Sequence, residues 1–447
     1  MKKVITYGTY DLFHQGHYNL LKRAKELGDY LIVGVTTDHF DEARGKLNVI
    51  DSTLERVENV RKTGLADKII IEEYDGQKIE DIQRYGVDIF TVGSDWIGTF
   101  DYLNDYCDVV YLERTPNVSS TQLREGRFDL VRMGIVGTGE MGTRLLEGTK
   151  YVSGVGVVSA YNPEKENAAV FEREYDIPCI TESYEVFLEG VDAVYIASPN
   201  ETHFAYAKAA LENGKHVLCE KPLSFTKNEA ESLYSYAKEH NLVLLEAIKT
   251  AYCPGFQQLI NVAKSGVIGE IRDVEAAFTR IADEDSRERT DAEFGGSFLE
   301  FGGYTLLPIF KLLGIDYKDV HFYTMKDENG VDIYTKVYLE YEQAIATAKT
   351  GVAVKSEGQL VISGTKGYIL AESPWWLTKK FVVRFEDPNK IETYNPVFKG
   401  DGLRYEVSEF VSQINGRGKK GYKLTAEEAI AMAEVTEKYM DYKKGSM

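Results

Sequence analysis

The stretch MGIVGTGEMG at 133–142 constrains the fold more than any other part of the chain. Its first residues predict a short buried strand, and Gly137, Gly139 and Gly142 then form a G-x-G-x-x-G turn before a predicted helix. In such a turn the first glycine permits the bend, the second lets backbone N–H groups reach a pyrophosphate, and the third lets the helix pack closely. A glycine-rich turn that binds no ligand would have the same sequence pattern. Dinucleotide-binding units usually begin a domain, however, and a long, complete-looking segment precedes this one. The sequence therefore predicts two enzymes joined in one chain.

Composition limits the class of protein. The 447 residues suffice for two or three domains, and the hydrophobic fraction of 43% is that of a globular protein. The net charge of −19 argues against nucleic acid or an anionic membrane as the main partner. No apolar run reaches the ~18 residues of a membrane span, and the start, MKKVITYGTYDLF, lacks the apolar core of a secretory signal. The four cysteines show no metal-type spacing, so we expect reduced thiols in a cytoplasmic protein.

The first segment begins with a predicted strand at 3–7, a helix at 16–27 and a second, parallel strand at 30–35. His14 and His17 lie at the turn between strand and helix as H-x-G-H. Two imidazoles at a helix N-terminus can donate hydrogen bonds to a phosphate that gains charge during displacement. Two polar turn histidines, or half of a metal site, would show the same pattern.

Three motifs in this segment resemble one family: GTYDLFHQGH at 8–17, VGSDW at 92–96 and RTPNVSST at 114–121. They are similar to nucleotidylyltransferases, most closely the glycerol-3-phosphate cytidylyltransferases, and the resemblance covers residues 1–126. It implies attack by a phosphomonoester oxygen on the α-phosphorus of CTP, with pyrophosphate leaving. Because this nucleophile is already an anion, positioning and charge stabilisation can suffice for catalysis.

The resemblance also implies roles for single residues. His14 and His17 would stabilise the transition state, Lys46 and Arg114 would neutralise the triphosphate, and Arg56 would bind the acceptor phosphate. The other residues expected to bind the nucleotide are Thr9, Tyr10, Asp11, Phe13, Gly16, Asp95, Ser119, Ser120 and Thr121. Asp11 is also the candidate ligand of a divalent ion, expected to be Mg²⁺. Structural roles for Arg56 and Asp95 stay open. The signature glycine is Asn117 here, which tolerates left-handed backbone angles.

Strand and helix patterns alternate after the glycine motif, which predicts a doubly wound parallel sheet. We expect a linker at 127–132, an NAD(P)-binding Rossmann domain at 133–250 and a substrate and oligomerisation domain at 251–447. The second strand of the Rossmann domain ends near Ala160, so no carboxylate is available there to repel a 2′-phosphate. Tyr161 follows instead of an arginine. The pattern slightly favours NADP over NAD.

SPNETH at 198–203 and GKHVLCEKPLS at 214–224 resemble the glucose–fructose oxidoreductase and inositol dehydrogenase family of NAD(P)-dependent enzymes. The resemblance implies that Lys221 reaches the substrate oxygen and that Pro222, after a cis peptide bond, aims the lysine. An exposed E-K-P turn is the alternative, and His203 could equally be a structural residue at a helix start. The expected cofactor contacts are Gly137, Thr138, Gly139, Glu140, Met141, Gly142, Tyr161, Ser198, Pro199, Asn200, His203, Glu220 and Pro222.

The last part of the chain alternates polar and apolar residues over long strands, which predicts a large, mostly antiparallel sheet in an α+β domain. Such sheets often form the dimer contact in this family, so we expect a homo-oligomer. In GGSFLEFGGYTLL at 295–307, Glu300 and Tyr304 lie four residues apart, on one helix face. Tyr304 would be the general acid, with a pKa lowered by nearby Lys221, unless it is a packing aromatic. Glu300 replaces the aspartate usual in the family.

Together these motifs indicate a bifunctional enzyme. One half would reduce a small sugar or ketose phosphate with NAD(P)H, and the other would couple the polyol phosphate to CTP. CDP-glycerol is the favoured product and CDP-ribitol the second, for teichoic-acid or capsule synthesis. Two alternatives stay open: a dehydrogenase that acts on the CDP-linked polyol, and a dinucleotide-binding domain that serves only as a sensor or scaffold.

Overall fold

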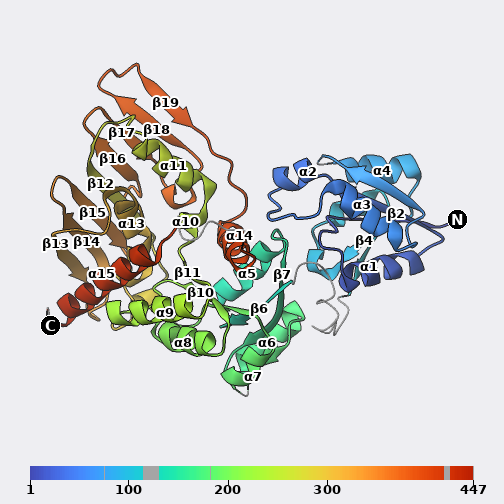
Figure 1. The fold of residues 1–447 in the computed structure, drawn as a ribbon, viewed down its shortest axis with the longest axis horizontal. Coiled ribbons are helices and arrows are strands. Elements are labelled where there is room, and N and C mark those ends of the chain that lie inside the picture. Colours follow the sequence, from blue (N-terminus) through green and yellow to red (C-terminus); the bar gives the residue numbers. More distant parts are fainter. Residues whose placement is uncertain (75, 114–129, 182, 417–422, 446–447) are drawn as a thin grey trace. The chain divides into compact units, whose positions relative to one another are not determined.

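The computed structural model describes residues 1–74, 76–113, 130–181, 183–416 and 423–445. These residues form two compact units (Figure 1). The first contains residues 1–132, 149–156 and 173–176, and the second contains residues 133–148, 157–172 and 177–447. In the part of the chain that is described, no helix has the length and apolar character needed to cross a membrane.

The first unit is built around a five-stranded parallel sheet with the order β3-β2-β1-β4-β5. Its strands are β1 (Lys3–Gly8), β2 (Tyr30–Thr36), β3 (Lys68–Glu72), β4 (Ile89–Gly93) and β5 (Asp108–Leu112). Its helices are α1 (Gln15–Glu26), α2 (Asp38–Ala43), α3 (Thr53–Lys62) and α4 (Gln77–Tyr85), with short 3-10 helices η1 (Ser94–Trp96) and η2 (Asp101–Asp105). The strand order reverses beside β1, and ligands of open parallel sheets bind at the carboxyl edge at such a point.

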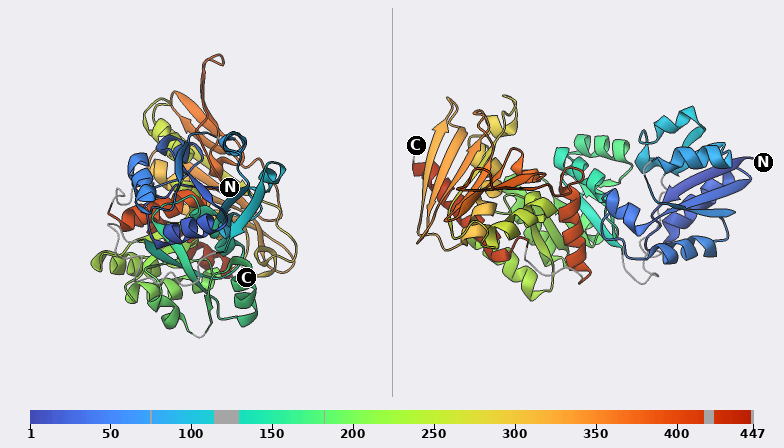
Figure 2. Two further views of the ribbon diagram at one scale, coloured as in Figure 1. Left: turned by 90° about the vertical axis from the view of Figure 1, so that its right-hand side faces the viewer. Right: turned by 90° about the horizontal axis from the view of Figure 1, so that it is seen from above.

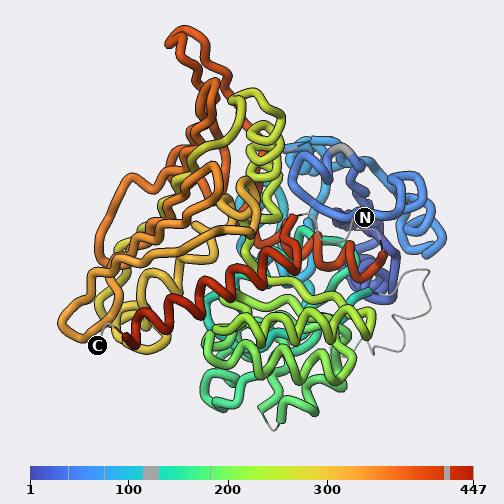
Figure 3. Tube along the Cα trace, turned by 60° about the vertical axis from the view of Figure 1, so that its left-hand side comes forward, coloured from blue at the N-terminus to red at the C-terminus, as the bar shows by residue number. Residues whose placement is uncertain are grey.

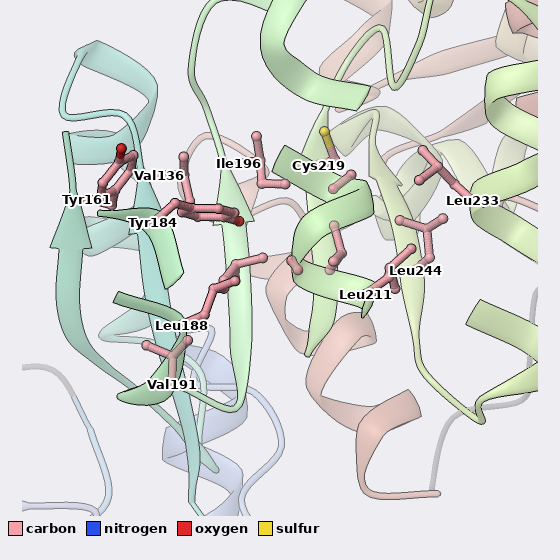
Figure 4. Close-up of a cluster of buried hydrophobic side chains, with 14 of the residues drawn as sticks. Val136, Tyr161, Tyr184, Leu188, Val191, Ile196, Leu211, Cys219, Leu233 and Leu244 are labelled. Atoms are coloured by element: carbon pink, nitrogen blue, oxygen red, sulfur yellow. The ribbon is translucent and has the colours of Figure 1, made fainter. Parts of the chain in front are cut away.

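A second parallel sheet has the order β11-β10-β9-β6-β7-β8, with β6 next to the reversal. Its strands are β6 (Val131–Val136), β7 (Val155–Tyr161), β8 (Cys179–Ile180), β9 (Ala193–Ile196), β10 (His216–Glu220) and β11 (Leu244–Ala247). The accompanying helices are α5 (Glu140–Thr149), α6 (Lys165–Tyr175), α7 (Tyr184–Glu189), α8 (His203–Glu212) and α9 (Lys227–Glu239), with a short 3-10 helix η4 (Asn200–Thr202). Figure 4 shows the buried cluster that joins strands β6, β9 and β10 to helices α7 to α9.

The largest sheet has eight strands in the order β13-β14-β15-β12-β16-β17-β18-β19, seen side by side in Figure 2. The strands are β12 (Ile271–Thr279), β13 (Asp319–Lys326), β14 (Asp332–Glu340), β15 (Ile345–Gly351), β16 (Leu360–Gly364), β17 (Gly367–Ala371), β18 (Phe381–Phe385) and β19 (Ile391–Tyr394). Only the β12–β15 pair is parallel among these described strands, which confirms the mostly antiparallel sheet that the sequence predicts.

The helices of this part of the chain are α10 (Lys249–Tyr252), α11 (Pro254–Lys264), α12 (Arg287–Thr290), α13 (Ser297–Leu313), α14 (Leu403–Ile414) and α15 (Ala426–Gly445), with η5 (Trp375–Leu377). Helix α13 packs on β12, β14 and β15, and α15 runs beside α9 and α13 (Figure 3). The α/β fold class predicted from the sequence is therefore confirmed, with two parallel Rossmann-like sheets and one large mixed sheet.

Candidate active sites

Two histidine rings meet where β1 passes into α1. His14 is the N-cap of α1, and its Nδ1 accepts a hydrogen bond from the backbone N–H of Gly16 at 3.0 Å. The His14 and His17 rings stack with their centroids 4.0 Å apart. A Cβ on Gly16 would lie 2.8 Å from His14 Cε1, so glycine at this position lets the His14 ring fold back over the turn. The structure thus brings the H-x-G-H motif together at a helix N-terminus, where an anion is favoured.

Both imidazoles are neutral near pH 7. Burial lowers the pKa of His14 to about 4. The pKa of His17 lies well below its ordinary value because of burial and the positive charges that His14 and Lys46 would present. Since Nδ1 of His14 accepts a hydrogen bond, its proton lies on Nε2, which can donate to a ligand. Nδ1 of His17 is buried and has no hydrogen-bond partner among the described residues.

Some of the residues expected to bind the nucleotide lie next to the histidine pair. The Phe13 ring lies 5.4 Å from that of His17, and the Tyr10 ring, which is buried, lies 5.5 Å from it. Tyr10 has a φ of 54°, in the left-handed region. The ammonium of Lys46 donates to the Lys150 carbonyl oxygen at 2.7 Å, and its charge contributes to the lowered pKa of His17. The Tyr10 and Phe13 rings therefore pack against the His17 ring and hold it in place.

The structure gives Asp11 a structural contact that the sequence does not reveal. Its carboxylate accepts hydrogen bonds from the backbone N–H groups of Ile50, at 3.0 Å, and Asp51, at 2.8 Å. Asp51 in turn accepts one from the N–H of Leu12 at 3.1 Å. Across the described residues, no three His, Cys, Asp or Glu side chains come together as a metal site. Asp11 is thus engaged in holding the loop at 50–51, and a magnesium ligand at this position stays a prediction.

Arg56, expected to bind the acceptor phosphate, lies inside the unit instead. Its side chain is fully buried, and all five of its N–H groups have protein acceptors. The acceptors are the carbonyl oxygens of Thr9, Thr36 and Asp51, the carboxylate of Asp38 and the hydroxyl of Thr53. This arrangement leaves no donor for a phosphate, so the position of Arg56 corrects the sequence-based expectation: it joins β1, β2 and α3.

Asp41 and Arg44 complete this network, and sequence reasoning missed both. Asp41 is buried and accepts hydrogen bonds from Thr36 Oγ1, at 2.7 Å, and from Thr9 Oγ1, at 3.1 Å. Arg44 Nη2 donates to Thr9 Oγ1 and to Asp41, both at 2.6 Å. The hydroxyl of Thr9, expected at the nucleotide, is therefore held in an ion-pair network. The i,i+3 spacing of Asp41 in α2 and Arg44, the residue after its end, is the one signal that could have indicated it.

The remaining expected residues of the first site are distributed differently. Asp95 is exposed in η1, beside the half-buried Trp96, whose ring lies 6.1 Å from that of Phe100. Arg114, Ser119, Ser120 and Thr121 lie outside the described residues.

The glycine motif of the second site has the geometry that a dinucleotide needs. Gly137 has a φ of 94°, and a Cβ there would lie 2.6 Å from the carbonyl oxygen of Ala197. A Cβ on Gly142 would lie 2.5 Å from the carbonyl oxygen of Gly137. At Gly139 a Cβ would meet nothing within 4 Å, which leaves open space over the start of α5. Glu140 and Met141 begin α5, so their N–H groups point toward this space. The residues present therefore fit a bound pyrophosphate.

At the end of β7 the structure differs from the expectation for Tyr161. Its ring is buried in the cluster of Figure 4, with ring centroids 5.3 Å from Tyr184 and 5.8 Å from Phe187. The next residue, Asn162, donates a hydrogen bond from Nδ2 to Thr138 Oγ1 at 2.7 Å. The burial of Tyr161 corrects its assignment as a cofactor contact, because Asn162 is the side chain at the glycine turn.

Lys221 and Glu300 form the centre of the second site. The Lys221 ammonium lies 3.1 Å from Glu300 Oε1, donates to the Glu300 carbonyl oxygen at 2.9 Å, and stands 5.8 Å from the centre of the Tyr304 ring. The Lys221–Pro222 peptide bond is cis, as the resemblance implies. β10 and α13 thus bring together the two motifs that the sequence separates by about eighty positions.

The loops around Lys221 are held by buried polar contacts. The imidazole of His203 is buried, with Nδ1 2.8 Å from the Pro222 carbonyl oxygen and Nε2 2.9 Å from that of Ser198. The Tyr195 hydroxyl donates to the buried carboxylate of Glu220 at 2.5 Å. His203 and Glu220 therefore bind other protein groups in the interior. For His203 this is the structural role at a helix start that the sequence left open.

Hydrogen bonds also hold the loop at 198–200 in place. Ser198 Oγ lies 2.7 Å from Thr202 Oγ1, and Asn200 Nδ2 donates to the Phe294 carbonyl oxygen at 3.1 Å. Pro199 between them is exposed. Arg287 pairs with Glu201, at the end of this loop, at 2.6 Å.

The pKa of Tyr304 is raised, whereas the sequence-based expectation was a pKa lowered by Lys221. Burial raises the pKa of Tyr304 well above its ordinary value, and the carboxylates of Glu220, Glu406 and Glu300 raise it further, while Arg144 lowers it. Lys221 is paired with Glu300, which offsets its charge. Tyr304 is therefore protonated, and its hydroxyl makes no hydrogen bond within the described residues, which suits a proton donor awaiting a substrate.

Asp332, which the sequence did not single out, anchors the helix that carries Glu300 and Tyr304. It is fully buried and accepts hydrogen bonds from the Phe298 N–H and the Ser297 hydroxyl, both at 2.8 Å, at the first turn of α13. Tyr439 donates to the same carboxylate at 2.8 Å. A carboxylate at a helix N-terminus satisfies N–H groups that have no partner in the helix.

Comparison with known proteins assigns both units. A family model described as cytidylyltransferase-like matches residues 5–126, the oxidoreductase family with an NAD-binding Rossmann fold matches 131–247, and the GFO/IDH/MocA C-terminal domain matches 256–370. Glycerol-3-phosphate cytidylyltransferase of Bacillus spizizenii is 49% identical over 126 residues, which are 28% of this chain and 96% of the relative. The scyllo-inositol 2-dehydrogenase (NADP(+)) IolU of Bacillus subtilis is 27% identical over 318 residues, 69% of this chain and 95% of the relative.

Solved structures show the same fold for the second part. UDP-N-acetylglucosamine 3-dehydrogenase GnnA from Acidithiobacillus ferrooxidans aligns with a TM-score of 0.58 at 20% identity, over 69% of this chain and 96% of that chain. KijD10, a 3-ketoreductase from Actinomadura kijaniata in complex with NADP and TDP-benzene, aligns with a TM-score of 0.59 at 22% identity and the same coverage.

Fold, sites and relatives define the class: a two-part enzyme with a nucleotidyl-transferring domain and an NAD(P)-binding oxidoreductase. Through its first 126 residues the chain belongs to the glycerol-3-phosphate cytidylyltransferase family, fused to an oxidoreductase of the GFO/IDH/MocA family.

Proposed function

We propose that the chain reduces a small keto- or aldo-sugar phosphate with NAD(P)H and then couples the polyol phosphate to CTP, releasing pyrophosphate. CDP-glycerol made from dihydroxyacetone phosphate is the favoured route, and CDP-ribitol is the second. The observation that carries the proposal is one chain holding both the stacked His14–His17 pair and the Lys221–Glu300 pair beside Tyr304. A CDP-polyol would feed teichoic-acid or capsule synthesis.

In the cytidylyl transfer, His14 donates from Nε2 to an oxygen of the α-phosphate as negative charge grows there. Because burial lowers its pKa to about 4, the His14 ring is neutral and acts only as a hydrogen-bond donor. Lys46 supplies positive charge beside His17. We expect Mg²⁺ to accompany CTP, because phosphate oxygens are ligands that it prefers.

In the reduction, NAD(P)H when bound supplies the hydride to the carbonyl carbon. The Lys221 ammonium stabilises the negative charge that develops on the carbonyl oxygen, and Glu300 holds that ammonium in place. The hydroxyl of Tyr304 donates the proton. Asn162 in place of a carboxylate after β7 favours NADP, because a carboxylate there would repel a 2′-phosphate.

The direct test supplies the purified chain with CTP, NADPH and dihydroxyacetone phosphate and measures CDP-glycerol. Its formation supports the proposal, and its absence removes the favoured route. Omitting NADPH and replacing the carbonyl substrate by glycerol 3-phosphate tests the cytidylyl transfer alone.

A second candidate is a dehydrogenase that acts on the CDP-linked polyol. The names of two relatives of the same fold favour it: one is a UDP-N-acetylglucosamine 3-dehydrogenase, and the other is a ketoreductase crystallised with TDP-benzene. Purified CDP-glycerol or CDP-ribitol would then reduce NAD(P)⁺ on the enzyme, and neither would do so if the first route holds.

We also propose that the protein forms a homo-oligomer through the large sheet. Strands β13 to β15 expose Tyr323, Met325, Tyr338 and Ile345, and exposed apolar side chains on a sheet are typical of a protein interface. Light scattering of the purified protein gives the number of chains, and a monomer would contradict this part of the proposal.

A further inference from the structure

Residues 149–156 belong to the first unit, although they lie inside the stretch 131–247 that matches the NAD-binding oxidoreductase family. They connect the end of α5 to the start of β7. The cytidylyltransferase-like match covers only residues 5–126. The contacts of this segment therefore add to the first unit a part that the matched cytidylyltransferase region does not contain.

The segment pairs through its backbone with the loop that follows α2. Leu47 and Val152 form a parallel β-bridge. The Leu47 N–H donates to the Tyr151 carbonyl oxygen at 2.7 Å, and the Ser153 N–H donates to the Leu47 carbonyl oxygen at 2.9 Å. Val152 and Ser153 are buried. Because buried peptide groups are costly to leave without a partner, this pairing fixes the backbone of the loop at Leu47.

Lys46, the residue expected to neutralise the triphosphate of CTP, precedes Leu47 in this loop. Its ammonium donates to the Lys150 carbonyl oxygen at 2.7 Å, and its backbone N–H donates to the Asp41 carbonyl oxygen at 2.7 Å. A long side chain loses rotamer freedom when it is held in one place. The contact with Lys150 means that part of this loss precedes the binding of CTP.

The same segment contacts the residues after β4. The Tyr151 ring meets the Trp96 ring edge-on, with centroids 5.9 Å apart, and the Lys150 ammonium lies 5.7 Å from the centre of the Trp96 ring. Strands β1 and β4 are neighbours in the parallel sheet, where the strand order reverses. Residues after their carboxyl ends flank the crevice in which ligands of such sheets bind. One segment thus holds both the Lys46 loop and Trp96 at this edge.

We propose that residues 150–153 complete the cytidylyltransferase site, and that Tyr151 is a positioning residue that keeps the Lys46 loop and Trp96 in the arrangement that binds CTP. This inference rests on the proposed function of the first site. It means that a residue within the oxidoreductase part of the sequence determines nucleotide affinity at the other site. Because the segment orders the loop before CTP arrives, it acts on the affinity for CTP and not on the chemical step.

The test substitutes Tyr151 in the full chain and measures pyrophosphate release from CTP with glycerol 3-phosphate. Tyr151→Ala removes the ring that packs on Trp96, so we expect the KM for CTP to rise about fivefold, within the range for loss of an aromatic pair, with kcat and NADPH affinity nearly unchanged. Tyr151→Phe keeps the ring and should restore the KM. Tyr106→Ala, at an exposed tyrosine of the same unit, is the matched control.

Hydrogen exchange of the peptide that contains Leu47 gives a second measurement that does not depend on activity. The Tyr151 carbonyl oxygen protects the Leu47 N–H, so this peptide should exchange faster in Tyr151→Ala, and saturating CTP should restore its protection. Peptides of β1 and β2 should keep the exchange of the parent protein.

Parent-like KM and parent-like protection of Leu47 in Tyr151→Ala would overturn the inference alone. Faster exchange throughout the first unit, with kcat falling as KM rises, would also overturn it, because the segment would then only stabilise the fold. If the parent chain releases no pyrophosphate from CTP, the proposed function of the first site falls and this inference falls with it.

Discussion

The Lys221 ammonium and the Glu300 side chain lie 3.1 Å apart, and the same ammonium donates to the Glu300 backbone carbonyl at 2.9 Å. These two contacts to one residue hold the flexible Lys221 side chain in place. The first turns of α13 therefore determine the position of the Lys221 ammonium. This geometry also explains why glutamate can replace the shorter aspartate, since its extra methylene brings the carboxylate to the ammonium.

We expect Lys221→Met to slow reduction strongly and to leave cytidylyl transfer intact. Loss of a positioned charge at the reacting oxygen costs about 10²–10³ in kcat. NADPH oxidation with the carbonyl substrate and pyrophosphate release from CTP with glycerol 3-phosphate measure the two activities on one preparation. Unchanged hydride transfer in this variant would show that Lys221 is not the group at the substrate oxygen.

Glu300→Gln separates the charge of Glu300 from its backbone contact. The variant keeps the helix and the carbonyl acceptor of Lys221 but loses the ion pair, so we expect kcat for reduction to fall about tenfold, with the melting temperature nearly unchanged. Glu300→Asp should lie between the two, because the shorter side chain weakens the 3.1 Å contact. If Gln is as active as Glu, the pair does not orient the ammonium.

The histidine pair predicts how the first unit responds to acid. The pKa of His14 is lowered to about 4 by burial, whereas in the unfolded chain it is about 6.5. Between these values the unfolded chain binds protons that the folded unit does not. The free energy of unfolding of the first unit therefore falls as pH falls through this window.

Hydrogen exchange of the β1 and α1 peptides across this pH range, corrected for the intrinsic rate, measures the loss. The double variant His14→Gln, His17→Gln removes both groups and should flatten the dependence. An equally steep dependence in that variant would assign the acid sensitivity to other groups.

Because Arg56 is buried, we expect its substitution to lower the stability of the first unit and not the affinity for substrate. Arg56→Met leaves the buried carboxylate of Asp41 and three backbone carbonyl oxygens without this donor, at a cost of about 3–5 kcal/mol, the range for breaking a buried ion pair. Urea denaturation of the variant measures this. Arg61→Met on the same helix is the control, and we expect a change within about 0.5 kcal/mol because its side chain is exposed. A raised KM for glycerol 3-phosphate with normal stability in Arg56→Met would restore the phosphate-binding role.

Local motifs were sufficient to predict the fold and part of both sites. The H-x-G-H turn, the glycine turn and the E-K-P turn each place their residues through contacts a few positions apart, as between His14 and Gly16. The alternation of strand and helix fixes which strands are parallel, and so the edge at which these turns lie.

The residues that the sequence did not reveal depend on contacts between distant segments. Arg56 is an ordinary helix residue until α3 packs against β1 and β2, where its partners are backbone carbonyl oxygens with no sequence signature. Tyr151 and Trp96 meet only because residues 149–156 fold onto the first unit, far from Trp96 in the chain. The raised pKa of Tyr304 likewise depends on burial by the whole second unit, which no local motif encodes.

The glycine turn gives the sharpest test of the dinucleotide site. A Cβ on Gly139 meets no atom within 4 Å, so Gly139→Ala should fold with an unchanged melting temperature, yet lose NADPH affinity by tenfold or more because the methyl group occupies the space of the pyrophosphate. Gly137→Ala should instead destabilise the second unit, since its φ is 94° and its Cβ would lie 2.6 Å from a backbone carbonyl oxygen. Calorimetric titration with NADPH, together with thermal unfolding, separates the two effects. Normal NADPH binding by Gly139→Ala would place the cofactor elsewhere.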